Sequence, residues 1–160
     1  MNILNVKPDE KGNSLQAKSR TVVLGNEEDR SWEKSEVYAP VISKAGARSL
    51  IAHGVPMGRI AKQADAKNAF CHPEMPDDEV VVVTPPKGYP YSKPGEYWLL
   101  KKTLYGLRRP PFHWFHTLKK ALNTISLTVC EHDPCVSTGQ APDGTTLFVG
   151  TYVEDMRVRW

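Results

Sequence analysis

Three carboxylates from two distant parts of the chain are the side chains best suited to chemistry. Glu154 and Asp155 are adjacent and stand between two β-prone runs, residues 146–153 and 156–160, so we expect a hairpin with both acids at its tip. Adjacent carboxylates repel each other unless a cation or strong hydrogen-bond donors lie between them. With Asp65 as a third ligand they would form an oxygen-rich pocket of the kind that Mg²⁺ prefers.

Such a pocket could hold two cations. Two ions about 3.5–4 Å apart stabilise the attacking and the leaving oxygen of a phosphoryl transfer. Glu-Asp is also a poor sequence for a two-residue turn, because neither residue favours positive φ, and locally unfavourable sequences concentrate at functional sites. The alternative is an exposed turn whose acids are solvated, and the residues alone leave both interpretations open.

The cysteines and histidines suggest a competing interpretation, a zinc site. His132 lies between Cys130 and Cys135, and Cys71-His72 could supply further ligands. The spacing Cys-x-His-x-x-Cys fits no common zinc-binding frame, so we expect no zinc site. Three cysteines are also too few for a disulfide scaffold, which favours a reducing, intracellular location in the cytoplasm or nucleus.

Size and composition limit the remaining classes of protein. The 160 residues suffice for one domain, and 11 glycines and 13 prolines fall below the range of low-complexity disorder. No apolar run approaches the roughly 18 residues of a membrane span, and residues 1–13 are too polar for a secretory signal, so we expect neither a membrane protein nor a secreted precursor. The 21 Lys and Arg against 18 Asp and Glu permit nucleic-acid binding without requiring it.

Local patterns in the first part of the chain predict a strand and a loop. Residues 21–24 form a β-branched run that ends at Gly25-Asn26, which predicts a strand closed by a turn. If this strand extends back over Lys18 and Arg20, both lie on the same side of it. Residues 26–34 are acidic and have the composition of a loop.

The middle of the chain predicts a helix and a strand. Residues 43–53 have helical spacing of apolar and small residues, with Ser43 as the N-cap and Gly54 as the stop. The pattern over residues 65–70 suits helix and strand equally. Residues 79–84 predict a strand, because four consecutive valines suit a sheet and lose rotamer freedom in a helix.

The last part of the chain predicts a loop, a short strand and a long helix. Residues 85–94 contain four prolines and predict a loop, and residues 97–101 predict a short strand. A helix should begin at Pro111, because apolar residues then recur near a 3.6-residue period. These apolar positions are Phe112, Phe115, Leu118, Leu122 and Ile125. We expect Phe115, Leu118 and Leu122 to be buried, and Lys119, Lys120 and Asn123 to face water.

Six short motifs occur in a characteristic order. They are Lys18-Ser-Arg20-Thr-Val-Val-Leu-Gly25, Tyr38-Ala-Pro-Val41, Asp65-Ala-Lys-Asn-Ala-Phe70, Leu104-Tyr-Gly-Leu107, Asp133-Pro-Cys135 and Tyr152-Val-Glu-Asp155. Each motif alone is weak. In this order and at this spacing, the series resembles the reverse transcriptase domain of copia-type long-terminal-repeat retrotransposons, from about Lys7 to the end of the chain.

The resemblance implies a fold and an activity. The fold would be α+β, the palm and fingers of a right-hand polymerase with an antiparallel palm sheet packed with helices. Residues 1–35 and 75–110 would be fingers-like, and 36–74 and 111–160 palm-like. The activity would be DNA synthesis from deoxynucleoside triphosphates on an RNA template and a DNA primer. The primer 3′-hydroxyl would attack the α-phosphate, with pyrophosphate leaving.

The same resemblance assigns roles to individual residues. Asp65, Glu154 and Asp155 would be catalytic and hold two Mg²⁺ ions. Lys18 and Arg20 would neutralise the triphosphate, or simply be an exposed basic strand end. Phe70 would lie against the sugar, or be an ordinary core residue. Tyr105 and Gly106 would lie along the template and the nucleotide. Arg108 and Arg109 would contact phosphates, or belong to a solvated basic loop. Asp133-Pro-Cys135 would be a structural turn.

Four departures from the family pattern bear on activity. Glu154 replaces an Asp and is longer by roughly 1.5 Å, more than the Mg²⁺ ligand shell tolerates. The usual Leu-x-Gly after Phe70 reads Cys71-His72-Pro73, and the stretch 107–112 has a second proline. The sequence stops one strand after the hairpin, so we expect the thumb, ribonuclease H, protease and integrase parts to be absent. These departures predict a decayed retroelement fragment that is inactive alone. Whether it is an enzyme stays open, and the alternatives are a nucleic-acid-binding remnant and a relic without function.

Overall fold

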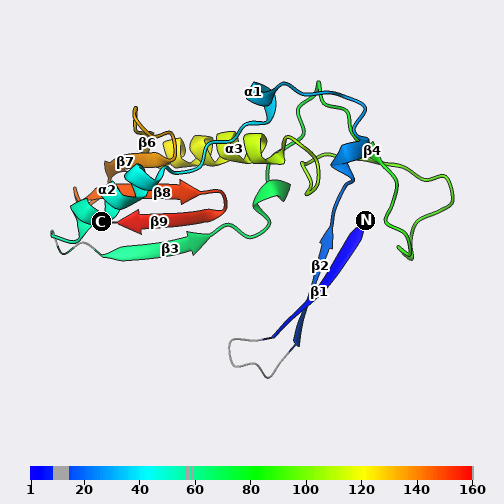
Figure 1. Cartoon of the computed structure of the whole chain (residues 1–160), viewed down its shortest axis with the longest axis horizontal. Helices are drawn as coiled ribbons and strands as arrows, with labels where there is room; N and C mark the ends of the chain where they lie inside the picture. Colours follow the sequence, from blue (N-terminus) through cyan, green and yellow to red (C-terminus); the bar gives the residue numbers. More distant parts are fainter. Residues whose placement is uncertain (9–14, 57, 59, 160) are drawn as a thin grey trace. The chain divides into compact units, whose positions relative to one another are not determined.

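The computed structural model describes residues 1–8, 15–56, 58 and 60–159 (Figure 1). The chain divides into two compact units, one made of Met1–Val37 and Phe70–Pro110, the other of Tyr38–Ala69 and Pro111–Trp160. Each unit is therefore built from two separate stretches of sequence. Within the described residues, no helix has the length and apolar character that crossing a membrane requires.

The second unit contains an antiparallel sheet of five strands in the order β3-β9-β8-β7-β6. The strands are β3 (Ala61–Asp65), β6 (Thr128–Val129), β7 (Val136–Gln140), β8 (Thr146–Tyr152) and β9 (Asp155–Arg159). Two helices accompany them, α2 (Lys44–Gly54) and α3 (Pro110–Thr124). Mixed helix and antiparallel sheet confirm the predicted α+β class.

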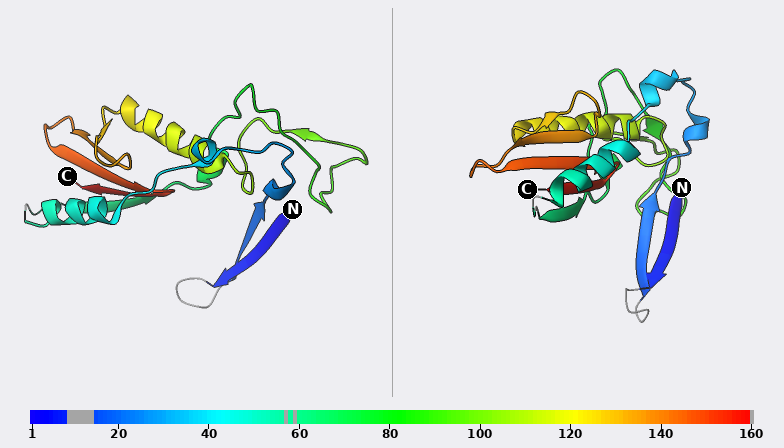
Figure 2. Two further views of the ribbon diagram at one scale, coloured as in Figure 1. Left: turned by 45° about the horizontal axis from the view of Figure 1, so that its top comes forward. Right: turned by 60° about the vertical axis from the view of Figure 1, so that its left-hand side comes forward.

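The two helices cover opposite faces of this sheet (Figure 2). Val149 of β8 is 2% exposed and belongs to the core that Leu122 of α3 shares. The next residue, Gly150, points to the other face, where an added Cβ would meet the Leu50 side chain of α2 at 2.6 Å. The alternation of side chains along β8 thus gives each helix its own apolar surface.

Helix α2 begins as the sequence predicts. The Ser43 hydroxyl oxygen accepts a hydrogen bond from the backbone N–H of Gly46 (2.8 Å), which satisfies one free donor of the first turn. The Asp133 carboxylate accepts further bonds from the N–H groups of Ser43 and Cys135, both at 3.0 Å. Asp133 therefore ties the turn 133–135 to the start of α2.

Helix α3 confirms the predicted helix and corrects part of its buried face. Leu122 is buried, whereas Phe115 and Leu118 are only half-buried. Trp114, which lies outside the predicted apolar stripe, is buried at 7% exposure. Ile125, the last position of the apolar period, lies beyond the helix and is 63% exposed, because the helix ends at Thr124 and the chain turns at Ser126, which has φ +60°.

Of the three residues predicted to face water on α3, two are exposed. Lys120 and Asn123 are exposed, whereas Lys119 is half-buried. A long lysine side chain can cover apolar surface with its methylene groups and still keep its charge in water.

The first unit has little regular structure. Its elements are the hairpin β1 (Asn2–Pro8) with β2 (Leu15–Thr21), the short helices η1 (Gly25–Glu27) and α1 (Lys34–Val37), η2 (Ala69–Cys71) at the boundary, and the pair β4 (Val82–Val83) with β5 (Trp98–Leu99). Residues 85–94 are a loop, as predicted.

The predicted strands of this unit are displaced or shortened. The strand expected over 21–24 ends at Thr21, and the N–H of Val23 instead donates to the carbonyl oxygen of Tyr105 (2.8 Å). The strand expected over 79–84 is only two residues long, because its partner β5 is equally short and the N–H of Glu79 closes a turn onto Pro76. Tertiary partners, rather than β-propensity, decide where these strands end.

Candidate active site

The hairpin between β8 and β9 turns one residue earlier than predicted. Tyr152 pairs with Asp155, so Val153 and Glu154 form the two-residue loop and Asp155 is the first residue of β9. The expectation that both acids sit at the tip is therefore wrong for Asp155. Val153 has φ +55°, a left-handed conformation that a β-branched residue rarely adopts. The unfavourable local conformation expected at this turn lies on Val153.

The turn is held by a contact from α3. The indole Nε1–H of Trp114 donates to the carbonyl oxygen of Val153 at 2.7 Å. Trp114 is buried, and this bond satisfies its one polar group. Spacing could not identify this residue, because its partner is a backbone atom of a distant turn.

Asp65 lies at the same place as the hairpin acids. It is the last residue of β3 and pairs directly with Asp155 of β9, so both side chains project from one face of the sheet. The N–H of Ala66 donates to the carbonyl oxygen of Glu154 at 2.9 Å, which brings the third acid beside them through the backbone. Asp65 is thus a neighbour of the two hairpin acids in the fold, although it lies about 90 residues before them in the sequence.

Gln63 is a further member of this cluster that the sequence analysis missed. It lies two residues before Asp65 on the same strand and therefore on the same face. Its side-chain Nε2–H donates to Asp155 Oδ1 at 3.1 Å. A donor to this oxygen partly offsets the repulsion between the two aspartates.

The oxygen donors of this cluster suit a hard divalent cation in type. Asp65 and Asp155 offer two carboxylates on one face, and Glu154 is the adjacent third acid. Across the described parts of the chain, however, no three His, Cys, Asp or Glu side chains are gathered closely enough to hold a metal ion. The pairing of strands therefore places two of the predicted ligands together, and Glu154 is linked to β3 through the backbone.

In the first unit, three of the predicted nucleotide-binding residues form a cluster. The Tyr105 ring lies 5.3 Å from the Phe70 ring, centroid to centroid. The Arg20 guanidinium lies 5.9 Å from the centre of the Tyr105 ring. Phe70 is half-buried, and the Thr103 hydroxyl donates to its carbonyl oxygen at 2.6 Å. Lys18 belongs to the same strand as Arg20, opposite Asn5.

The structure gives Gly106 a reason within the chain to be glycine. It has φ +95°, and a Cβ placed on it would lie 1.9 Å from the carbonyl oxygen of Val23. A Cβ on Gly25 would in turn lie 1.9 Å from the carbonyl oxygen of Gly106. The close backbone approach at this turn is therefore made by the chain to itself.

Of the two adjacent arginines, Arg109 is held by partners within the chain and only Arg108 is solvated. The guanidinium of Arg109 forms an ion pair with Glu79, whose side chain is 6% exposed, and its Nε–H donates to the carbonyl oxygen of Glu36 (3.1 Å). It also lies 4.6 Å above the ring of Trp32. Arg108 is exposed, and its Nε–H donates to the carbonyl oxygen of Gly25 (3.2 Å). Arg109 has a structural position, whereas Arg108 faces solvent.

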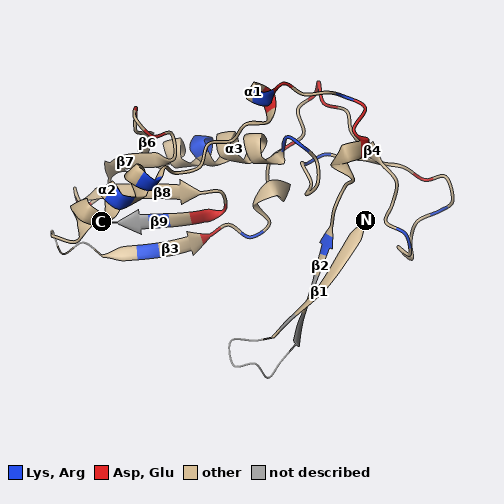
Figure 3. Cartoon of the chain, viewed as in Figure 1, with Lys and Arg blue, Asp and Glu red and all other residues tan. Residues whose placement is uncertain are grey.

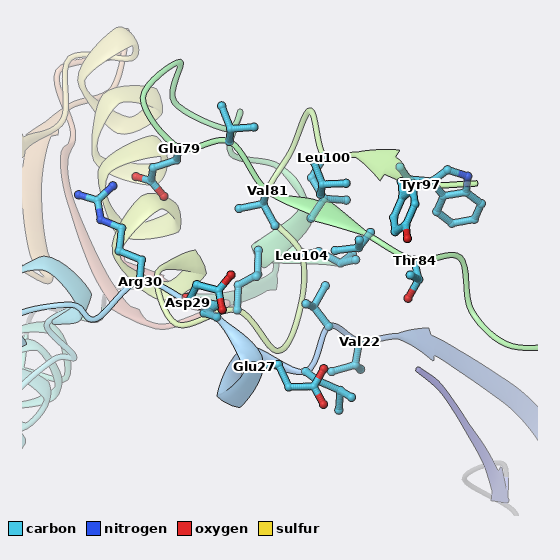
Figure 4. A pocket seen from close by; sticks show the side chains of 18 of the residues that line it. Val22, Glu27, Asp29, Arg30, Glu79, Val81, Thr84, Tyr97, Leu100 and Leu104 are labelled. Atoms are coloured by element: carbon cyan, nitrogen blue, oxygen red, sulfur yellow. The ribbon is translucent and has the colours of Figure 1, made fainter. Parts of the chain in front are cut away.

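A cavity of about 760 Å³ lies within the first unit. In Figure 4 the apolar side chains of Val22, Val81, Leu100 and Leu104 line it, with the acids Glu27 and Asp29 among its walls. None of the residues predicted to act in catalysis or nucleotide binding lines this cavity. Its apolar wall joins the 21–32 segment to the β4–β5 pair.

Cys71 lies beside the aromatic cluster. Burial raises the pKa of its thiol, and a hydrogen bond with the backbone of Tyr105 opposes that rise. A raised pKa keeps the sulfur protonated and unreactive at neutral pH. Cys71, Cys130 and Cys135 are all free thiols.

Comparison with known proteins identifies the family of this chain. The family described as reverse transcriptase (RNA-dependent DNA polymerase) matches residues 3–159. One similar protein is the retrovirus-related Pol polyprotein from transposon TNT 1-94 of Nicotiana tabacum, which is 24% identical over 98% of this chain and 12% of its own length. The retrovirus-related Pol polyprotein from transposon RE1 of Arabidopsis thaliana is 26% identical over 98% of this chain and 10% of its own length. The one from transposon RE2 of the same plant is 25% identical over 98% of this chain and 11% of its own length.

The chain thus spans about a tenth of the length of these relatives. No solved structure gives a significant match. With nearly every residue matched, and with retrotransposon polyproteins as its relatives, the chain belongs to the reverse transcriptase family.

Proposed function

We propose that this chain derives from the polymerase core of a copia-type retrotransposon and that Asp65, Asp155 and Glu154 are its catalytic acids. The pairing of Asp65 with Asp155 carries the proposal, because it joins two motifs that are remote in sequence and that the resemblance assigns to one site. The two units support an assignment of Tyr38–Ala69 with Pro111–Trp160 to the palm and of the other unit to the fingers.

The proposed reaction is RNA-directed DNA synthesis. Two Mg²⁺ ions held by Asp65, Asp155 and Glu154 would supply charge neutralisation at the α-phosphate and at both of its reacting oxygens. The chain's own residues bind and orient the nucleotide. Arg20 and Lys18 contact the triphosphate, and Phe70, fixed by Tyr105, lies against the sugar and excludes a ribose 2′-hydroxyl. Exposed Arg108 contacts a template phosphate, whereas Arg109 positions the turn.

Glu154 limits this activity. Its side chain is one methylene longer than the Asp of the family, and Glu154 contacts the β3 segment through the backbone hydrogen bond from the N–H of Ala66 to its carbonyl oxygen. A displacement of about 1 Å in a catalytic geometry costs on the order of 10²-fold in rate. We therefore infer that the chain by itself polymerises very slowly, and Glu154→Asp should restore the ligand length.

The test is Mg²⁺-dependent incorporation of a labelled deoxynucleotide on a primed RNA template. We expect Glu154→Asp to exceed the unmodified chain by on the order of 10²-fold, and a second change, Asp65→Asn, to abolish that gain. Asp77→Asn, an exposed acid in the other unit, is the matched control and should leave the gain intact. Equal incorporation by Glu154→Asp and Glu154→Asp/Asp65→Asn would overturn the catalytic assignment.

The second candidate is a nucleic-acid-binding remnant without catalysis. Arg20 and Arg108 are exposed and belong to the same unit, which favours it. Its signature is template affinity that falls as salt rises and weakens in Arg20→Ala and Arg108→Ala, without any Mg²⁺-dependent incorporation.

A further inference from the structure

The loop between β4 and β5, residues 84–97, is a series of turns. Gly88 and Gly95 have φ +85° and +78°, as the third position of a type II turn requires. The N–H of Tyr89 bonds to Pro86 O (3.0 Å), that of Ser92 to Tyr89 O (3.3 Å) and that of Glu96 to Lys93 O (3.1 Å). Because Pro86, Pro90 and Pro94 restrict φ within these turns, the loop loses little conformational entropy when it binds a ligand.

This loop presents aromatic rings to solvent. Tyr89 packs edge-on against Tyr91 (5.7 Å between ring centres, 71°) and against Trp98 of β5 (5.1 Å, 89°). Tyr91 is nevertheless 80% exposed and Tyr97 66% exposed. A loop held in place by hydrogen-bonded turns thus leaves two tyrosine rings accessible to a ligand.

The charged residues of the loop favour an anionic, planar ligand. Lys87 and Lys93 are exposed and stand on either side of Tyr89 and Tyr91 in the sequence, and neither forms an ion pair within the described residues. Figure 3 shows basic segments in blue along the loop that follows β4. The one acid of the loop, Glu96, is engaged internally: its carboxylate accepts bonds from the N–H of Lys93 (2.8 Å) and from the Trp98 indole (3.0 Å). Those bonds hold the pKa of Glu96 below its usual value.

We propose that the loop 84–97 is a platform for single-stranded nucleic acid, with bases stacked on Tyr91 and Tyr97 and phosphates contacted by Lys87 and Lys93. Every base offers a ring face, so such binding tolerates any sequence, and unpaired bases alone can reach the tyrosines. A protein that recognises polyproline helices is disfavoured as the partner of this proline-rich loop. A polyproline helix has three residues per turn, whereas Pro86, Pro90 and Pro94 recur every four residues, and the positive φ of Gly88 and Gly95 interrupts an extended helix. The proposal goes beyond catalysis, since it needs neither the carboxylates nor a metal.

The test is fluorescence anisotropy of a labelled single-stranded oligouridylate of about 16 nucleotides, measured with the full chain in EDTA. We expect Tyr91→Ala to weaken binding by roughly tenfold, Tyr91→Phe to retain it, and Lys87→Ala and Lys93→Ala each to reduce the salt dependence by about 0.7 in log–log slope. Tyr38→Ala, a 61%-exposed tyrosine of the other unit, is the matched control and should bind normally. Because Tyr91 is exposed, its variants should melt at the same temperature as the unmodified chain.

Three results would overturn the proposal. They are the absence of binding, equal affinity of Tyr91→Ala and Tyr38→Ala, and equal affinity for a duplex of the same length. If the oligonucleotide does not bind, a protein is the alternative partner for the exposed tyrosine rings. The assay contains no divalent cation, so its failure is independent of the Mg²⁺-dependent incorporation that tests the catalytic acids.

Discussion

Asp65 lies directly opposite Asp155 across the antiparallel pair β3–β9, with both side chains on one face of the sheet. Like charges in a directly opposed pair destabilise a sheet. The amide of Gln63, on the same face of β3, donates a hydrogen bond to the Asp155 carboxylate at 3.1 Å. The fold therefore keeps a repulsive pair in a position where a cation would relieve it.

This repulsion predicts how one substitution changes stability without metal and how it changes the response to metal. In EDTA, Asp65→Asn should raise the free energy of unfolding by about 0.2–1 kcal/mol, because the opposed charges are removed. Mg²⁺ should raise the melting temperature of the unmodified chain and have a smaller effect on Asp65→Asn. Thermal melts with EDTA and with Mg²⁺ check both effects, and equal Mg²⁺ shifts in the two proteins would contradict the metal site.

The positive φ of Val153 predicts an unusual order of stabilities. A non-glycine residue in this conformation costs about 1–3 kcal/mol, and glycine avoids that cost. Val153→Gly should thus unfold at higher urea concentration than Val153→Ala, which keeps the strain. At Val149, a buried strand position, the order should reverse, since glycine weakens a strand. Matching orders at both positions would show that the turn carries no strain.

The ion pair of Arg109 and Glu79 predicts a large loss on removal of one partner. Both side chains are largely buried, so Arg109→Ala leaves the Glu79 charge buried and uncompensated, at a cost of about 3–5 kcal/mol. Arg30→Ala is the control, because its pair with Glu36 is exposed and 3.9 Å long and should contribute less than about 1 kcal/mol. Chemical denaturation compares the two variants; similar losses would mean that Arg109 is not structurally required.

Crowding at Gly106 can be separated from its backbone conformation. Gly106 and Gly144 both have positive φ, +95° and +82°, so an alanine is strained at either place. Only at Gly106 would the Cβ also meet backbone, at 1.9 Å from Val23 O, whereas Gly144 has nothing within 4 Å. Gly106→Ala should therefore destabilise the chain more than Gly144→Ala does, which two thermal melts can decide. Equal losses would mean that φ alone requires the glycine.

Asp133 predicts a loss of stability in acid. Burial by itself raises the pKa of this carboxyl, but hydrogen bonds from the N–H groups of Cys135 and Ser43 and from the Ser43 hydroxyl outweigh burial and hold the pKa below its usual value. A carboxyl whose pKa is lowered by folding stabilises the fold at pH values above its pKa in the unfolded chain, which is about 4. That contribution is lost as the pH falls through the pKa of the folded state. Unfolding free energies should drop below about pH 4, and the drop should be smaller in Asp133→Asn.

The amino-acid pattern predicts well where local chemistry is decisive. The Ser43 hydroxyl caps α2 whatever packs on that helix, and the loop 85–94 follows from its prolines. Strand limits are predicted badly, as at 79–84, because a strand ends where its partner ends. The role of Trp114 in holding the turn likewise depends on a distant segment, because its hydrogen-bond acceptor is 39 residues away in the sequence.

By itself the sequence determined the kinds of chemistry available, carboxylates for a hard cation and basic and aromatic residues for a nucleotide, together with the family to which their order belongs. The tertiary structure alone decided which of these residues are neighbours. It paired Asp65 with Asp155, moved the turn onto Val153 and Glu154, and placed Arg109 in a buried ion pair. The reason is that strand register and burial depend on contacts between segments far apart in the chain, which no local pattern of residues encodes.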